Sequence, residues 1–313
     1  NDCNSLTLGA NNVPQGTVNG QPVNSDVATR LYVACGNSAD PFRPYVGTSG
    51  INNVTNSAQS VYNAIQVGIT RYFGRLNGSL AYTYGHSLDD ASDGSSNAEM
   101  VNGLNQHMSY ASSNYDERHV LEASAVYDLP FFTSPGLLHS LLGGWQISDL
   151  TGFQTGTPFS ITNNSSFADN AGTGNTISNN SNGSLQSYPD LIGPLHGAVA
   201  IKHPAGVQGP RLYNSDAFGP PQGLTYGTAG RNILNLPSRT NFDMGLFKSF
   251  AVHEDMHFEF RAEAFNVFNH TQWSGINQNS CYSSQQDCSA SPFLTATSAH
   301  NARILQLAGK FVF

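Results

Sequence analysis

The chain has 313 residues, of which only 11% are charged, and its formal net charge is -8 at pH 7. Soluble domains carry about 25% charged residues, and here Asn, Ser, Thr and Gly replace the missing charge. The composition disfavours a helical bundle, and a nucleic-acid partner is excluded because phosphate binding needs clustered Lys and Arg. No stretch approaches about 18 consecutive apolar residues, so we expect no transmembrane helix, whereas a barrel strand needs only about 9 to 11 residues with one apolar face.

Residues 1–57 are polar and rich in turn formers, and we expect them to form an extracellular loop segment that precedes the first strand. The opening Asn1-Asp2-Cys3 contains no basic segment followed by an apolar one. We therefore expect that any signal peptide has been removed or that the chain begins within a longer protein.

The four cysteines fall into two pairs, Cys3 with Cys35 and Cys281 with Cys288, each in a polar, turn-rich stretch. Such pairs favour disulfides that close loops in an oxidising compartment. Zinc is the alternative, but it would need a C-x-x-C type of spacing or histidines in register, which neither pair has.

Strict alternation of apolar and polar side chains recurs about seven times and predicts β-strands. The first strand covers about 61–70, and the second covers 75–88 after a tight turn at Gly74. In the second strand one face is apolar and aromatic, while the other is small and polar. The apolar face carries Leu76, Leu80, Tyr82, Tyr84 and Leu88.

Five more strands are predicted at 118–129, 145–155, 239–250, 256–269 and 303–313. Two charged residues fall on their apolar faces. Asp149 predicts either a bulge or a position near a membrane interface, because an acid facing lipid at mid-membrane is costly. Lys248 lies near a strand end, where its long stem is expected to reach the interface.

The connections between these strands alternate in length. Short ones lie near Gly74, at 130–143 and around Val252, and long ones cover 89–117, 158–238 and 270–302. Outer-membrane barrels have short periplasmic turns and long extracellular loops. We therefore predict an all-β fold in which 58–313 forms the C-terminal strands of an antiparallel transmembrane β-barrel, incomplete because about seven strands cannot close a barrel of even strand number.

Several motifs resemble the C-terminal barrel half of Oar-like TonB-dependent receptors, a family of outer-membrane proteins that often carry a carboxypeptidase-regulatory-like N-terminal domain. The resemblance covers most of the chain from about Pro41 onward and depends on the order and spacing of motifs that are weak singly. They are Ser87-Leu88-Asp89-Asp90, Asp116-Glu117-Arg118-His119, Gly143-Gly144-Trp145-Gln146, Gly156-Thr157-Pro158-Phe159, Gly230-Arg231-Asn232 and the run from Phe260 to His270.

The resemblance implies a bacterial outer-membrane location with extracellular loops and a periplasmic C-terminus. The partners that it implies are outer-membrane lipid, a small or oligomeric solute, and TonB and a plug domain supplied by N-terminal parts that this sequence lacks. The chain end also looks like the signal that the barrel-assembly machinery recognises. That signal comprises Gln306, Ala308, Phe311 and Phe313, with Ala308 in place of the usual Gly.

Two motifs suggest metal chemistry. His253-Glu254-Asp255-Met256-His257 matches H-E-x-x-H, which binds zinc on a helix, but alternation from Met256 onward predicts a strand. Histidines four residues apart in a strand are about 13 Å apart, too far to share one ion. The acidic run from Asp89 to Gly94 suggests a calcium loop, but Ala91 and Met100 occupy ligand positions of an EF-hand, so loose calcium binding and a solvated acidic loop remain the alternatives.

Two sets of residues are candidates for contact with a solute. The first set is expected to face the barrel interior. Its members either form salt bridges between strands or to a plug, or they contact the solute. The set comprises Glu122, Glu259, Arg261 and Glu263. The second set lies in the loop at 158–238, where it stacks on a sugar or peptide or simply packs the loop; it comprises Tyr188, Tyr213, Phe218 and Tyr226.

The sequence thus predicts a receptor that binds and imports a bulky solute such as an oligosaccharide, a peptide or a metal chelate. We expect no enzymatic activity, cofactor or metal site. The alternatives are a structural or adhesive outer-membrane surface protein and a soluble secreted carbohydrate-binding β-protein.

Overall fold

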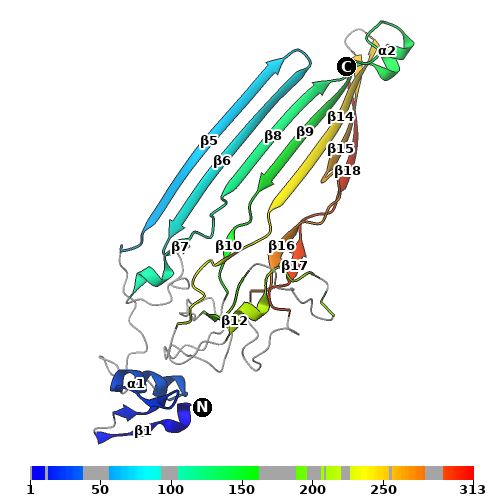
Figure 1. The fold of residues 1–313 in the computed structure, drawn as a ribbon. Helices are drawn as coiled ribbons and strands as arrows, with labels where there is room; N and C mark the ends of the chain where they lie inside the picture. The colour runs from blue at the N-terminus through cyan, green and yellow to red at the C-terminus, as the bar shows by residue number, and fades with distance from the viewer. Residues whose placement is uncertain are drawn as a thin grey trace.

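The computed structural model describes residues 2–10, 13–37, 56–92, 105–161, 188–195, 206–207, 209–219, 226–253, 256–278 and 292–313 (Figure 1). Its main feature is one antiparallel sheet in the order β18-β15-β14-β9-β8-β6-β5, with the short β7 added beside β6. Its strands are β5 (Ser60–Phe73), β6 (Leu76–Asp89), β7 (Ala111–Ser112), β8 (His119–Asp128), β9 (Trp145–Gln154), β14 (Arg239–His253), β15 (Met256–Phe265) and β18 (Ile304–Val312).

Each long strand pairs with the next long strand along the chain, and β5 and β18 form the two edges. The sheet is therefore open within the described residues. This is the expected fold, an antiparallel barrel portion that is incomplete on its own. None of the described helices is long and apolar enough to cross a bilayer.

The pairing register places the alternating apolar side chains of all seven long strands on one common face. One row across the sheet joins Ile69, Leu80, Ala123, Thr151 and Phe242. We call this side the apolar face and the opposite side the polar face. Because side chains alternate along a strand, a slip of one residue in any pair would have moved a whole strand's apolar set to the polar face.

The register corrects one expectation about β9. Asp149 lies on the apolar face opposite Ala125 and Met244, and the ladders on both sides of β9 run without a register shift. Of the two alternatives for Asp149, the bulge is therefore wrong, and a position near a membrane interface stays a prediction. The Thr151 hydroxyl instead donates a hydrogen bond to Asp149 Oδ2 at 2.9 Å, which satisfies part of the carboxylate locally.

The connections sort to opposite ends of the sheet, as Figure 1 shows. The turn end carries the β5–β6 and β14–β15 turns, the C-terminus and α2 (Leu137–Leu142) in the β8–β9 connection. In the β5–β6 turn Gly74 has a φ of 60°, which glycine adopts at little cost. The other end, which we call the loop end, carries the long connections.

At the loop end, described parts of two long connections pack into a small hydrophobic core. Phe218 and Phe293 meet edge to face at 5.9 Å between ring centroids, and the Leu212 amide donates to the Leu294 carbonyl at 3.0 Å. The connections are thus partly folded. Their described elements are β10 (Pro158–Phe159), β11 (Asp190–Leu191), η6 (Ser215–Ala217), β12 (Phe218–Gly219), β13 (Leu234–Asn235), β16 (Trp273–Ile276) and β17 (Ala296–Ala299), and the third long connection, between β6 and β8, contains η5 (Gln106–Ser109) as well as β7.

The described residues 2–10 and 13–37 form a small unit within the predicted loop segment at 1–57. A disulfide joins Cys3 to Cys35, as predicted, and Asn24 caps the helix by accepting a hydrogen bond from the Val27 amide at 2.9 Å. Cys281 and Cys288 lie outside the described residues. The unit comprises η1 (Asp2–Ser5), β1 (Thr7–Leu8), β2 (Pro14–Gln15), β3 (Thr17–Val18), β4 (Gln21–Pro22) and α1 (Ser25–Ala34).

Candidate functional site

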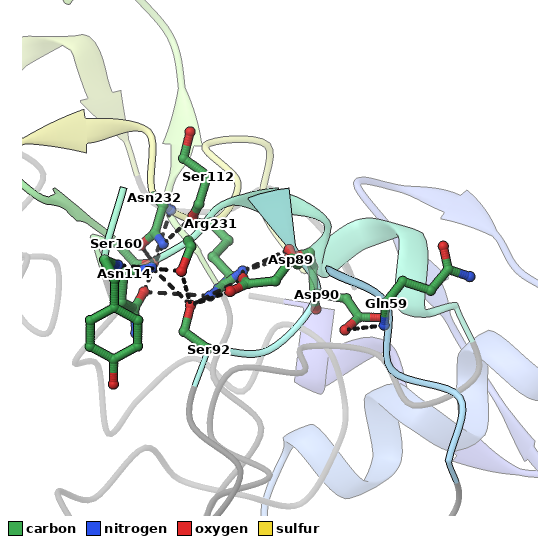
Figure 2. A network of polar contacts seen from close by, with 12 residues as sticks. Gln59, Asp89, Asp90, Ser92, Ser112, Asn114, Ser160, Arg231 and Asn232 are labelled. Atoms are coloured by element: carbon green, nitrogen blue, oxygen red, sulfur yellow. Dashed lines mark hydrogen bonds and ion pairs between the residues drawn. The ribbon is translucent and has the colours of Figure 1, made fainter. Parts of the chain in front are cut away.

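A polar junction at the loop end brings together motif residues that are far apart in the sequence (Figure 2). It joins the ends of β6 and β7 and the segment that follows β7 to the stretch just before β13. We define the loop junction as Asp89, Ser92, Asn114, Arg231 and Asn232.

Arg231 is the centre of the loop junction, and its side chain is only 2% exposed. Nη1 lies 2.7 Å from Asp89 Oδ1 and also donates to the Asp89 and Ser109 carbonyls at 3.0 and 3.2 Å. Nη2 donates to the Ser92 hydroxyl at 2.6 Å and to Asn114 Oδ1 at 3.4 Å. A planar guanidinium with five donors suits such a set of convergent acceptors better than a lysine ammonium does.

Asn232 continues the loop junction toward β10 and has a φ of 53°, a left-handed conformation that Asn tolerates better than most residues. Its Nδ2 donates to the Ser112 carbonyl at 2.6 Å and to Asn114 Oδ1 at 2.7 Å. Its amide donates to the Ser160 hydroxyl at 3.0 Å. The turn thereby fixes the residues before β13 against β7 and β10.

The neighbouring acidic residues are also occupied by internal contacts. The Ser92 hydroxyl donates to Asp89 at 2.8 Å and accepts from the Asn114 amide at 2.8 Å. Both carboxylate oxygens of Asp90 lie 3.1 Å from the Gln59 amide. The first two acids of the suggested calcium loop therefore serve as acceptors for protein groups, and the rest of that loop from Asp93 lies outside the described residues.

A second cluster next to the loop junction is centred on Asp116, which is buried. The Asp116 carboxylate accepts from the Ser87 amide at 2.8 Å, from Arg118 Nε at 2.8 Å and from His86 Nδ1 at 3.0 Å. Burial raises the pKa of Asp116, but these hydrogen bonds and the Arg118 charge outweigh burial, so the pKa lies below its ordinary value. Arg118 also donates to His86 Nε2 at 3.2 Å, which assigns the imidazole hydrogen to Nδ1.

A third polar cluster fixes the connection that follows β15. The Asn266 amide donates to Asp243 Oδ1 at 2.8 Å, and Asn266 Nδ2 donates to the Asn301 carbonyl at 3.2 Å. Asn269 Oδ1 accepts from the Arg303 amide at 2.9 Å. Both asparagines have a φ of 51°, so they form the turn at the end of the Phe260–His270 motif.

The four predicted interior charges all lie on the polar face. Arg261 Nη2 pairs with Glu259 at 3.2 Å, and His257 lies 3.3 Å from the same carboxylate. Glu122 and Glu263 form no ion pair with another described residue. The ion pair among these four residues therefore joins two residues of the same strand, β15, and salt bridges between strands or to a plug stay a prediction.

The four loop aromatics pack inward. Tyr188 and Phe218 are 5% and 3% exposed in the loop core, and Tyr226 packs against it. The Tyr213 hydroxyl donates to the Asn235 carbonyl at 2.5 Å, and burial raises the pKa of Tyr213. These are the contacts of loop packing, the alternative that the sequence left open.

The H-E-x-x-H segment spans the end of one strand and the start of the next. β14 ends at His253 and β15 begins at Met256, and these two residues pair in the antiparallel ladder. Its two histidines therefore do not share a helix face. Among the described residues, no group of three or more His, Cys, Asp or Glu side chains is placed to hold a metal ion.

The chain end pairs with β15. Phe311 lies opposite Phe258 on the apolar face, while Gln306 and Ala308 lie opposite Glu263 and Arg261 on the polar face. Phe313 follows β18 and is 94% exposed. The polar and aromatic members of the suggested assembly signal are thus divided between the two faces.

Comparison with known proteins agrees with this architecture. The model of the outer membrane beta barrel domain family matches residues 6–306. No curated protein and no solved structure matches the chain. With an open antiparallel sheet, one apolar face and long connections gathered at one end, the chain belongs to the outer membrane beta barrel domain family.

Proposed function

We propose that the chain is the C-terminal barrel part of a TonB-dependent outer-membrane receptor that binds and imports a bulky solute. The solute class is an oligosaccharide, a peptide or a metal chelate. TonB and a plug domain act through other parts of the protein, and the long connections face the cell exterior.

The loop junction is the observation that carries this proposal. Three of its five residues, Asp89, Arg231 and Asn232, come from two of the motifs through which the sequence resembles Oar-like receptors, and the junction is built around one buried guanidinium. A receptor must hold its outer loops in a defined arrangement to recognise a solute, and a buried, hydrogen-bonded ion pair fixes geometry more than it adds stability. The junction supports a role in which the connection at 158–238 is held rigidly at one end.

The polar face supports solute passage on the side opposite the lipid. It carries Glu122, Glu259, Arg261 and Glu263, with Asn, Ser, Thr and Gln side chains between them. Charges are far less costly on a wet interior than on a lipid-facing surface. The proposed import is a conformational process and involves no covalent chemistry.

The test uses bacteria that produce the complete protein, with uptake of labelled oligosaccharides, peptides and iron chelates measured in parallel. We expect uptake of one class to be lost when the gene is deleted and when TonB is inactivated. Uptake that persists without TonB would contradict the proposal.

Two outcomes would favour the alternatives. Loss of cell attachment to surfaces, without loss of any uptake, would favour a structural or adhesive protein. A chain that stays dissolved without detergent and migrates identically on gels before and after heating would favour a soluble carbohydrate-binding protein.

A further inference from the structure

The β8–β9 connection at the turn end carries a cluster of exposed large apolar side chains. They belong to α2 and to the segment just before it, and they are between 47% and 82% exposed. Such a cluster on an otherwise polar connection marks an interaction surface. We define the turn-end apolar cluster as Phe131, Phe132, Leu137, Leu138, Leu141 and Leu142.

The helix presents its leucines on one side. At about 100° per residue, the four leucines of α2 span about 140° of its circumference, and His139 and Ser140 occupy the rest. His139 Nδ1 donates to the Phe132 carbonyl at 2.6 Å, which turns the imidazole toward the connection itself. The leucine side therefore faces away from the connection.

Lys248 fixes where this helix lies relative to the sheet. Its side chain belongs to the apolar face, in register with Trp145 and Phe260. The ammonium donates to the Gly143 carbonyl at 2.5 Å and lies 3.5 Å from the His139 carbonyl, at the C-terminal end of α2. A cation at this end is favoured by the helix dipole.

Two aromatic rings complete the site around Lys248. Its Nζ lies 4.8 Å from the ring centroid of Phe250 and 5.4 Å from that of Trp145. Lys248 as a whole residue is only 5% exposed. The Lys248 ammonium thus contacts backbone carbonyls at the C-terminal end of α2. These contacts hold the helix on the apolar side of the sheet.

No further barrel strand would cover this surface. The strands joined by the connection, β8 and β9, lie inside the sheet between β6 and β14. Strands that complete a barrel would add at β5 and β18, and the plug domain of the proposed receptor would lie within the polar interior. The turn-end apolar cluster therefore continues the surface of the sheet that meets lipid.

We propose that residues 131–142 form an interfacial membrane anchor that inserts the turn-end apolar cluster into the headgroup and upper acyl region of the phospholipid leaflet at the turn end. Amphipathic helices with a leucine side lie in the interface in this way. Lys248 is the positioning residue that holds the anchor against the sheet. This inference depends on membership of the barrel family and is independent of solute import.

The test places a nitroxide spin label at Leu138→Cys or Ser140→Cys in the complete protein, reconstituted into phosphatidylethanolamine–phosphatidylglycerol vesicles. The two positions lie on opposite sides of α2. We expect the label at 138 to be more accessible to oxygen, which partitions into lipid, than to a water-soluble nickel chelate. The label at 140 should show the reverse order.

Folding is checked for each variant by heat-modifiable migration, and Leu141→Cys replaces Leu138→Cys if the latter does not fold. Equal accessibility of both positions to the nickel chelate would overturn the proposal, since the helix would then lie in water. Protection of both labels from oxygen and from the nickel chelate would also overturn the proposal, because the turn-end apolar cluster would then pack on protein. In the Lys248→Met variant, we expect the labels at 138 and 140 to differ less in their relative accessibility to oxygen and to the nickel chelate.

Discussion

Arg231 Nη1 lies 2.7 Å from Asp89 Oδ1, and this ion pair joins residues that are 142 positions apart in the sequence. Both side chains are nearly inaccessible to solvent, at 2% and 8% exposure. The pair links the end of β6 to the segment before β13, so it ties the long β9–β14 connection to the sheet.

Removing one partner of this pair should release the connection. In Arg231→Met the Asp89 carboxylate stays buried without its cation, a change that typically costs about 3 to 5 kcal/mol. We expect faster protease cleavage within 158–238, while the strands remain folded by heat-modifiable migration. The double variant Asp89→Leu/Arg231→Met is the matched control. It removes both charges, so we expect cleavage within 158–238 to be slower than in Arg231→Met.

Asn232 offers a test of the left-handed turn in the loop junction. Asn232→Gly and Asn232→Ala both remove the hydrogen bonds to Ser112 and Asn114, but only alanine adds the cost of a φ of 53°. That cost is about 1 to 2 kcal/mol. We expect alanine to lower the free energy of unfolding in lipid vesicles by about this amount more than glycine does, and equal losses would contradict the turn assignment.

Asp116 predicts a dependence of stability on acid pH. Its pKa is lower in the folded than in the unfolded chain, so its contribution to stability is complete above about pH 4, the ordinary pKa of Asp, and is lost as pH falls through the folded pKa. Denaturant unfolding of the parent and of Asp116→Asn should therefore differ by a constant amount at neutral pH. The difference should shrink below pH 4, and a difference that grows with acid would refute the assignment.

Lys248 should stabilise the turn end through the Gly143 carbonyl. Lys248→Met keeps most of the apolar stem but leaves this carbonyl without its donor, a loss of about 1 to 3 kcal/mol for a buried group. We expect faster hydrogen exchange in residues 137–143. Lys310→Met on β18, at the polar face, is the control and should leave that exchange unchanged.

The chain end provides a test of assembly. Phe313→Ser and Phe311→Ser should lower the folded amount in the outer membrane several-fold if these aromatics act in recognition by the assembly machinery. Val312→Thr changes the intervening residue on the polar face and should leave the amount near that of the parent. Equal yields in all three variants would argue against the assembly signal.

The long strands were predictable because each carries many repeats of one pattern. The range 145–155 was predicted for the strand observed at Trp145–Gln154, and the apolar sets of all seven long strands share one face. The Cys3–Cys35 disulfide also followed from two cysteines in a turn-rich segment.

The short helix α2, the strands of the loop core and the loop junction have no local sequence pattern that predicts them. The six residues of α2 are too few for helical periodicity to be recognised, and the two-residue strands of the loop core carry none. The Arg231–Asp89 pair depends on how the folded connections bring distant segments together. Its residues were visible only as parts of short motifs, and a motif does not reveal its partner.

The sequential strand order also has a consequence for the route by which this sheet forms. β5 and β6, and likewise β14 and β15, are joined by turns of two residues, so each of these pairs can close as an independent hairpin within microseconds. The pairs β6–β8, β9–β14 and β15–β18 must first bring together ends separated by tens of residues, and this search costs more chain entropy. Hairpins should therefore be the units that dock, and the last strand joins β15 as a single strand after its neighbours have formed.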